Sequence, residues 1–323
     1  MGALIAACYS PHAPSGAPCD VAANNCPSGQ TCAVQGGASI CLRPEELGDG
    51  GLLDASLSDT PPDGDASVDP DLDDDGIANA ADNCPLAANA DQANEDGDPY
   101  GNVCDPCPPY TDGAQIDDGD QDGVSNGCDP HPGTPGDKIT LFAGFTGSSL
   151  PAALTSIGGW SVAGGKARIS TPTNGVATLT TTLPQTGGEK VSAQYTVTDL
   201  ELSPLPNAYA GLGVFTRRSG ADDGIVCSIV ATVIQQVFLR LYELPQETQR
   251  DSVTYPGMLG RTYLVEVDRD GSDYGCYAED AEDGTPNALI DTTVAITTAT
   301  PRAGIRARSV TATVDWFMIV TSP

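Results

Sequence analysis

The sequence predicts a mainly β protein, in which a C-terminal β-sandwich of the jelly-roll type follows irregular, disulfide-linked acidic repeats and a small cysteine-rich module. Three observations lead to this prediction. Short runs of β-branched and aromatic residues, separated by Gly, Pro, Asn and Asp, fill the C-terminal half. All but two of the 11 cysteines lie in the first 128 residues. Helical periodicity appears over no useful length, so strands and irregular loops are expected throughout.

The predicted sandwich covers residues 137–323. Its expected strands are the runs KITLFAGF, KARIS, ATLTTTL, KVSAQYTVTDLEL, GLGVFTRR, VFLRLYEL, TYLVEVDRD and TATVDWFMIV. A region of this length with many short strands suits a single two-sheet domain. Cys227 and Cys276 lie in two of the strand regions, and we expect them to form a disulfide.

The composition is strongly acidic, with 44 Asp and Glu against 14 Lys and Arg and a net charge of −30. A charge of this sign excludes nucleic acid as a partner and favours cations. No Lys or Arg occurs between Arg43 and Lys138. Within this stretch, residues 44–70 are mostly Gly, Pro, Asp, Ser and Leu without periodicity, and they are predicted to be a disordered acidic linker.

Residues 9–43 form the predicted small disulfide-rich module. Its cysteines are Cys19, Cys26, Cys32 and Cys41, in a segment too short for a core without crosslinks. Two disulfides are expected, and their three possible connectivities stay open. Zinc is the competing interpretation, but the chain has only His12 and His131 as histidines. Disulfides indicate an oxidising compartment, so the protein is predicted to be exported.

Residues 1–8 resemble the end of a bacterial lipoprotein signal. Ile5, Ala6, Ala7 and Cys8 are similar to a lipobox, in which small residues precede a cysteine that is then diacylated. Removing Cys8 from the count leaves ten cysteines, an even number that can all pair. We therefore expect lipidation of Cys8 and an outer-membrane-anchored lipoprotein facing the exterior, or a secreted protein. The lipid would be its sole attachment, because no stretch approaches a membrane span.

Acidic residues recur in one register at three places between Asp71 and Asp129. Counted as twelve-residue loops, the starts lie 23 and 24 residues apart. The candidate ligands of the first loop are Asp71, Asp73, Asp75, Ile77, Asn79 and Asp82 at positions 1, 3, 5, 7, 9 and 12. The second loop offers Asn94, Asp96, Asp98, Asn102 and Asp105 at positions 1, 3, 5, 9 and 12, and the third offers Asp118, Asp120, Asp122, Val124, Asn126 and Asp129.

This spacing suits calcium, a hard ion that takes six to eight oxygen ligands. Carboxylates at positions 1, 3, 5 and 12 and a backbone carbonyl at position 7 can surround one ion, and glycine at position 6 permits the sharp turn. The second loop differs, since it has Gly97 at position 4 and Pro99 at position 6. The intervening segments are rich in Pro, Gly and Cys rather than helical, which argues against an opening sensor switch.

The segments DLDDDGIANAADNCP, NEDGDPYGNVCDPCP and DDGDQDGVSNGCDP resemble thrombospondin type 3 repeats. The resemblance assigns residues 71–132 to calcium-binding repeats in which the chain winds around a string of ions with almost no hydrophobic core. It also implies that consecutive cysteines pair, Cys84 with Cys104 and Cys107 with Cys128. Such a segment is expected to lose its fold without metal.

The opening and ending of the sandwich resemble concanavalin A-like jelly rolls, the group that includes laminin G-like modules and many glucanases. A glucanase would use Glu266, Asp268 and Asp270, which share one face of a strand. The resemblance departs at Asp270, where those enzymes carry glutamate. The following RDGSD is typical of a hairpin turn, so these acids are expected to be an exposed strand end, and no catalytic residue is assigned.

Glycan binding needs aromatic platforms or a calcium-held polar cluster, and aromatic residues are only 5% of the chain. Trp160 and Trp316 lie in strand-like segments and are expected in the core. Asp222 and Asp223 are expected in a solvated turn. The favoured function is calcium-dependent adhesion or ligand binding, with a cell-surface or matrix glycan or protein as partner. The alternatives are a secreted glycoside hydrolase and a structural envelope protein.

Overall fold

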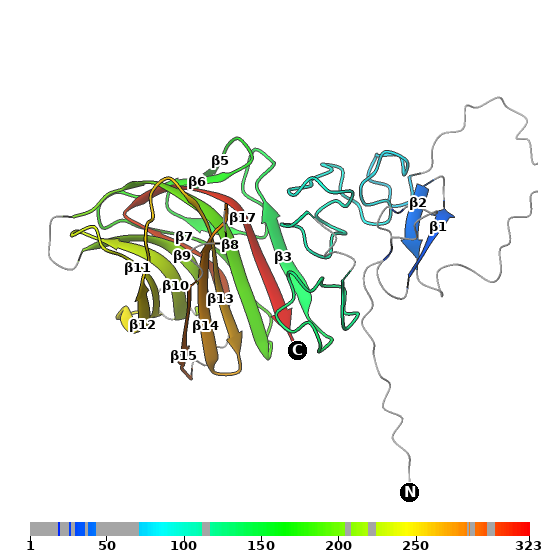
Figure 1. The fold of residues 1–323 in the computed structure, drawn as a ribbon. Helices are drawn as coiled ribbons and strands as arrows, with labels where there is room; N and C mark the ends of the chain where they lie inside the picture. Colours follow the sequence, from blue (N-terminus) through cyan, green and yellow to red (C-terminus); the bar gives the residue numbers. More distant parts are fainter. Residues whose placement is uncertain are drawn as a thin grey trace, which may run out of the picture. The chain divides into compact units, whose positions relative to one another are not determined.

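The structure is a computed structural model of the chain, and it divides into two compact units, Met1–Lys138 and Ile139–Pro323 (Figure 1). It describes residues 19, 26, 30–35, 38–42, 71–111, 117–203, 208–218, 224–282, 284, 288–295 and 301–323. Cys8, the remnant signal 1–8, the linker 44–70, and Asp222 with Asp223 lie outside the described residues. Within the described ranges, no helix has the length and apolarity to cross a membrane.

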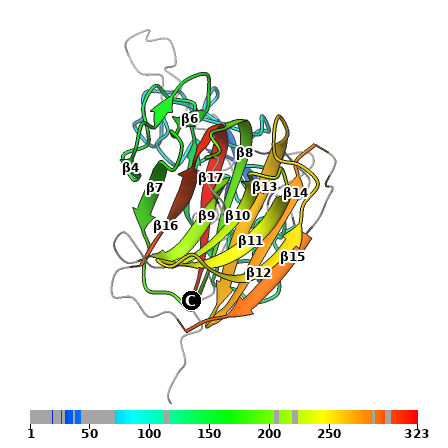
Figure 2. The ribbon, with the colours of Figure 1, turned by 90° about the vertical axis from the view of Figure 1, so that its left-hand side faces the viewer.

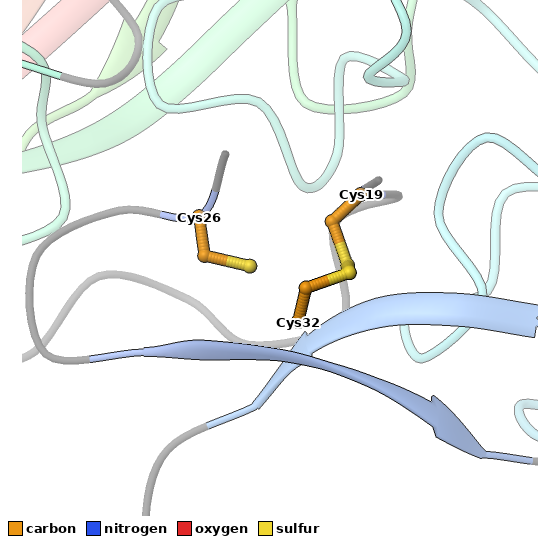
Figure 3. Close-up of side chains that lie close together, drawn as sticks. All are labelled: Cys19, Cys26 and Cys32. Atoms are coloured by element: carbon orange, nitrogen blue, oxygen red, sulfur yellow. A yellow bond between two sulfur atoms is a disulfide. The ribbon is translucent and has the colours of Figure 1, made fainter. Parts of the chain in front are cut away.

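The cysteine-rich module contains a short antiparallel hairpin of β1 (Thr31–Gln35) and β2 (Ala38–Leu42). Disulfides join Cys19 to Cys32 and Cys26 to Cys41, one of the three connectivities that the sequence left open. Cys19, Cys26 and Cys32 gather closely enough to suggest a metal site (Figure 3), but their sulfurs are oxidised in disulfides and therefore offer no thiolate ligand.

The acidic repeats fold without helix or strand in residues 71–111 and 117–137. Turns and bends follow one another, and disulfides join Cys84 to Cys104 and Cys107 to Cys128, as the resemblance implied. The apolar cluster of the first two loops is small and consists of Cys84, Tyr100 and Cys104. With so little apolar area to bury, this segment needs another source of stability.

The second unit is a two-sheet antiparallel sandwich, which confirms the predicted fold class (Figures 1 and 2). The seven-stranded sheet has the order β12 (Thr248–Thr254), β11 (Val237–Leu244), β10 (Gly224–Thr232), β9 (Tyr209–Arg218), β16 (Arg302–Arg308), β7 (Val176–Thr182) and β4 (Thr155–Ile157). The second sheet has the order β15 (Ala288–Thr293), β14 (Asp273–Asp280), β13 (Thr262–Asp270), β8 (Gly188–Leu200), β17 (Val310–Ser322), β6 (Ala167–Ser170) and β5 (Ser161–Val162), with β3 (Lys138–Gly144) paired to β17.

The core lies between the two sheets, where alternate side chains of each strand meet. On β9, for example, Ala210, Leu212 and Val214 are fully buried and face fully buried residues of β8 and β13 such as Val191 and Val265. Both tryptophans were expected in the core. Trp160, just before β5, is half-buried and packs against the core, whereas Trp316 is buried but lies outside that cluster. The predicted Cys227–Cys276 disulfide is confirmed and joins β10 of one sheet to β14 of the other.

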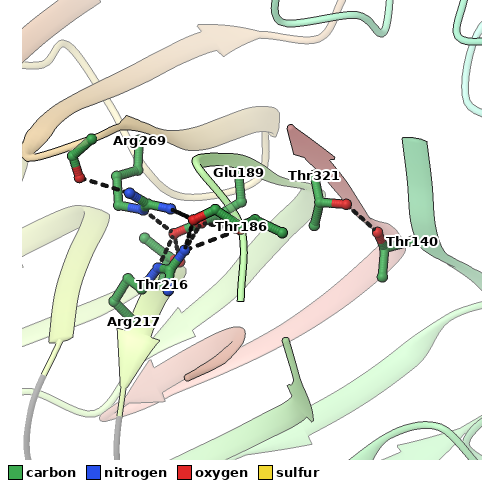
Figure 4. Close-up of polar contacts among 8 residues, drawn as sticks. Thr140, Thr186, Glu189, Thr216, Arg217, Arg269 and Thr321 are labelled. Carbon is green, nitrogen blue, oxygen red and sulfur yellow. Dashed lines mark hydrogen bonds and ion pairs between the residues drawn. The ribbon is translucent and has the colours of Figure 1, made fainter. Parts of the chain in front are cut away.

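A buried ionic cluster also joins the sheets (Figure 4). Glu189 of β8 accepts hydrogen bonds from Arg217 and Thr216 of β9 and from Arg269 of β13. Arg217 has a φ of 57°, an irregularity at the end of β9. Since alternation alone would point Thr216 and Arg217 to opposite faces, the left-handed residue allows both to reach Glu189.

Candidate metal-binding sites

Each acidic loop folds around its own side chains, and the same hydrogen bonds recur at equivalent positions. In all three loops, the aspartate at position 5 accepts a hydrogen bond from the backbone N–H of position 7. Asp75 accepts from Ile77 (2.8 Å), Asp98 from Tyr100 (2.7 Å) and Asp122 from Val124 (3.0 Å). The aspartate at position 12 accepts the N–H two residues further on, Asp82 from Cys84, Asp105 from Cys107 and Asp129 from His131. These turns point one oxygen of each carboxylate at the backbone.

The asparagine at position 9 closes each loop. Asn79, Asn102 and Asn126 accept the N–H of position 2, which belongs to Leu72, Glu95 and Gly119, at 3.0, 3.1 and 3.0 Å. The sequence predicted these asparagines as metal ligands. Their observed contact is with the backbone of the same loop, so they also act as clamps that set the loop diameter.

The backbone of the loops is left-handed at position 4 in all three loops and at position 6 in the first and third, and most of these positions carry glycine. Asp74, Gly97 and Gln121, all at position 4, have φ of 60°, 80° and 66°. At position 6, Gly76 and Gly123 have φ of 94° and 97°. The second loop has Pro99 at position 6, and its glycine stands at position 4. Its departure from the pattern therefore preserves the turn that all three loops share.

The loops bring carboxylates together in four groups whose ligand oxygens lie within 4.8 Å of one another. The groups are Asp71, Asp73 and Asp75; Asp96, Asp98 and Asp105; Asp118, Asp120 and Asp122; and Asp122, Asp129 and Asp137. Most of the predicted acidic ligands are thus gathered. Among the residues that the structure describes, Asp82 joins none of these groups.

Several carboxylate oxygens in these loops are buried without a hydrogen-bond donor. They include Asp73 Oδ2, Asp82 Oδ2 and Asp129 Oδ2 in the described part of the chain. Leaving a charged oxygen in this state costs roughly 1–3 kcal/mol or more. Burial, with neighbouring carboxylates, also raises the pKa of Asp73 and Asp120. A hard cation would supply the missing partner for each oxygen, so the donor set fits calcium.

The fourth group was missed by the sequence analysis. Asp137 is 1% exposed, and its Oδ2 lies 3.0 Å from His131 Nδ1, while its N–H donates to Asp122 Oδ2 at 2.6 Å. Burial, a hydrogen bond with Asp137 and the charge of Asp122 raise the pKa of Asp129 to about 8. Asp137 lies eight residues beyond the twelve-residue loop, so no loop template includes it. The segment HPGTPGD carries it back to Asp129.

The candidate catalytic acids lie in the second half of β13, from Glu266 in its middle to Asp270 at its end. Glu266 accepts from Ser192 Oγ at 2.9 Å and lies 3.5 Å from Lys190 Nζ. Asp268 and Asp270 are exposed, and they line a groove of about 510 Å³ together with Asp273 and Asp291. Gly271, with a φ of 61°, forms the predicted hairpin turn into β14. The expectation of an exposed strand end is therefore met by Asp268 and Asp270. It is wrong for Glu266, which is half-buried in the middle of β13 and held by Ser192 and Lys190.

Comparison with known proteins adds little beyond the architecture. No family model matches the chain, and no curated protein matches it. Similar solved structures include the CBM2 module of an evolved Dit from Lactobacillus casei BL23 phage J-1 (10% identity, 58% of this chain and 96% of that chain, TM-score 0.45). Lectin II from Ulex europaeus has 12% identity over 58% of this chain and 100% of that chain, with a TM-score of 0.43. Peanut lectin with a 9mer peptide has 11% identity over 57% of this chain and 98% of that chain, with a TM-score of 0.42. TM-scores below 0.5 carry no functional conclusion.

Proposed function

We propose that residues 71–137 bind calcium, and that the protein is an exported surface protein whose C-terminal sandwich binds a glycan or protein ligand. The single observation that carries the calcium assignment is the set of buried, unpartnered carboxylate oxygens repeated in loops of one geometry. All candidate ligands are oxygens, which suits a hard ion and not zinc. The resemblance to thrombospondin type 3 repeats supports the same assignment.

The repeats are the scaffold in this proposal, and the sandwich is the recognising part. Without metal, the carboxylates of Asp118, Asp120 and Asp122 would repel one another within 4.8 Å. Calcium neutralises them and replaces the missing core. The disulfides support an oxidising exterior, and attachment through a diacylated Cys8 belongs to the same proposal. Mass spectrometry of the native N-terminus would test that attachment through the mass of a diacylglycerol adduct.

Calorimetric titration of the full, oxidised chain with calcium tests the central assignment. Wild type should bind calcium at more than one site, with magnesium much weaker because it demands a near-octahedral shell. Asp120→Asn should remove binding at the third loop, while Asp268→Asn, on the exposed end of β13, serves as the matched control. Absence of heat and of a folding change on calcium addition to the metal-free chain would exclude the proposal.

The two other functions remain distinguishable by activity. A glycoside hydrolase would release reducing ends from a polysaccharide, and Glu266→Gln would abolish the release. A ligand-binding sandwich would retain glycan on an array without turnover. A structural envelope protein would do neither. The ion pair between Glu266 and Lys190 favours binding over hydrolysis, because it ties up a carboxylate that a glycosidase would direct at the substrate.

A further inference from the structure

The face of the seven-stranded sheet that points away from the core carries a row of aligned residues. Arg306 of β16 pairs with Gly213 of β9, Gly213 with Ser228 of β10, and Ser228 with Arg240 of β11. Neighbouring positions such as Ile305 face the core, so the row lies on the opposite side. Two arginines thus stand on one face of the sheet, with only glycine and serine between them.

Gly213 is required at its place in this row. A Cβ there would lie 2.1 Å from the carbonyl oxygen of Cys227 and 2.6 Å from Ser228 Cβ. The strands therefore approach too closely for any side chain at Gly213. Because Gly211 also lacks a side chain on the same face, the aromatic ring of Tyr209 and the arginines can cover this part of the sheet.

Arg306, Arg308 and Tyr209 form a connected cluster with Glu247, which stands in the turn between β11 and β12. Arg306 Nη2 and Arg308 Nη1 both donate to Glu247 Oε1 at 2.7 Å. Arg306 Nη1 donates to the hydroxyls of Tyr209 (3.3 Å) and Tyr242 (3.0 Å). Burial alone would raise the pKa of Glu247, but the Tyr209 hydrogen bond and the two arginines outweigh it and lower the pKa. Glu247 is therefore a fixed negative charge in this cluster.

Positive charge exceeds negative charge in this cluster, which we call the arginine face (Arg240, Arg306, Arg308, Tyr209 and Glu247). The guanidinium carbons of Arg240 and Arg308 lie 5.6 Å and 4.4 Å from the centroid of the Tyr209 ring. Within the described residues, the guanidinium of Arg240 has no hydrogen-bond acceptor and no carboxylate partner, and Arg308 Nε also has no acceptor. Three arginines against one glutamate leave an excess of two charges in a chain whose net charge is −30.

Such an excess of positive charge can attract an external anion. Arg240 and Arg308 are only partly buried, while Arg306, Tyr209 and Tyr242 beneath them are 8%, 8% and 2% exposed. Arg240, which has no acceptor among the described residues, and Arg308, whose donors are filled only in part, are therefore held beside buried side chains. Preorganised guanidinium groups bind planar carboxylates with two parallel hydrogen bonds.

We propose that the arginine face binds the carboxylate of an acidic saccharide. This inference deepens the proposed ligand binding by the sandwich and rests on it. The cluster lies in the middle of the sheet, on β16, β9 and β11, so a peptide cannot reach it by adding a strand to an edge. The negative charge of the rest of the chain repels a long polyanion. The arginine face can still bind a single carboxylate group.

Binding of a short oligogalacturonate to the full chain in saturating calcium tests the proposal. Its methyl-esterified form keeps the sugar and removes the charge, a sulfated neutral oligosaccharide offers a different anion, and an oligoglutamate offers carboxylates on a peptide. Wild type should bind the free oligogalacturonate at least about tenfold more tightly than the other three. Arg240→Gln should weaken that binding at least about tenfold, because one forked contact is lost.

The control variants separate this site from folding and from net charge. The guanidinium of Arg240 makes no hydrogen bond or ion pair within the described structure, so Arg240→Gln should leave the thermal midpoint nearly unchanged. Arg168→Gln removes the same charge from an exposed residue of β6, in the other sheet, and should keep wild-type affinity. Arg240→Lys keeps the charge without the fork and should bind with intermediate affinity.

Three outcomes would overturn the proposal. The first is equal loss of affinity in Arg240→Gln and Arg168→Gln. The second is tighter binding of oligoglutamate than of oligogalacturonate, which would assign the face to an acidic peptide. The third is no binding of any acidic probe by wild type. If a neutral glycan binds and is unaffected by Arg240→Gln, the arginine face is excluded while ligand binding by the sandwich stands.

Discussion

Glu189 and Arg269 form a two-pronged ion pair inside the sandwich. Arg269 Nε donates to Oε1 at 2.8 Å and its Nη2 donates to Oε2 at 2.7 Å. Arg217, from the opposite sheet, grips the same carboxylate through Nε at 2.9 Å and Nη2 at 2.7 Å. All three side chains are at most 7% exposed. One carboxylate thus fastens the two sheets together at this end of the sandwich.

Replacing Glu189 by glutamine should destabilise the sandwich strongly. The variant keeps the shape but leaves two arginines buried beside a neutral amide, and breaking a buried pair in this way costs about 3–5 kcal/mol. Urea unfolding followed by tryptophan fluorescence measures the loss. Glu266→Gln is the matched control, because Glu266 pairs with Lys190 at 3.5 Å near the surface and should cost less than about 1 kcal/mol. Equal effects of the two variants would refute the role of Glu189.

The same ion cluster predicts how stability depends on pH. Burial raises the pKa of Glu189, but Arg269, Arg217 and Thr216 outweigh it and lower the pKa below the ordinary value of 4.5. Because the pKa is lowered, the carboxylate stabilises the fold fully at pH values above its pKa in the unfolded chain. This contribution is lost as the pH falls through its pKa in the folded protein. The stability difference between wild type and Glu189→Gln should therefore be constant from pH 7 to 5. It should shrink on acidification below about pH 4. A gap that grows with acid would contradict this assignment.

Removing calcium should unfold residues 71–137 and spare the sandwich. The repeats have only a small apolar cluster and depend on charge neutralisation, whereas the second unit has an extended core of its own. Hydrogen exchange of the oxidised chain with and without chelator measures this. Amides of the loops, such as Gly76 and Gly123, should lose protection, and those of β9 and β13 should keep it. Chelator-resistant protection in the loops would show that metal does not hold them.

Asp137→Asn should weaken calcium binding at the third loop by about tenfold, since one charged ligand and its contact with Asp129 are lost. Asp291→Asn, exposed on β15, removes the same charge elsewhere and should leave calcium affinity unchanged. Calcium titration of both variants measures the difference. Wild-type affinity in Asp137→Asn would mean that this aspartate only shapes the turn with His131 and Asp122.

The sequence predicted much of this molecule, and the reasons differ between its parts. Strand runs such as KVSAQYTVTDLEL and the paired Cys227 and Cys276 follow from local periodicity, and the loop register follows from a fixed spacing of acids. Strand β16 was not among the predicted runs. The sequence of β16, RAGIRAR, could have indicated a strand with a basic face, because three of the 14 Lys and Arg residues of the chain lie in it.

Other features depend on contacts between distant segments, which one sequence does not show. Arg306 meets Glu247 across 59 residues, and Glu189 meets Arg269 across 80. Asp137 joins Asp129 only because the intervening chain turns back, and the clamp made by Asn79 needs the folded loop to be seen. In each case the residue type was visible, but its partner was set by the tertiary fold.

Removing the Cys227–Cys276 disulfide should lower the stability of the sandwich while leaving its fold intact. The crosslink joins positions 49 residues apart, and in the chain-entropy account a loop of this size contributes about 4 kcal/mol by restricting the unfolded chain. Both cysteines are fully buried, so the double change to alanine adds a small packing loss and avoids a buried thiol. Urea unfolding should show a lower midpoint with native circular dichroism before the transition.

Combining Glu189→Gln with the removal of the disulfide should lower the unfolding free energy by the sum of the two losses. The two features connect different strand pairs, β10 to β14 and β8 to β9. An unfolding free energy within about 1 kcal/mol of wild type would mean that the packed core alone holds the sheets together.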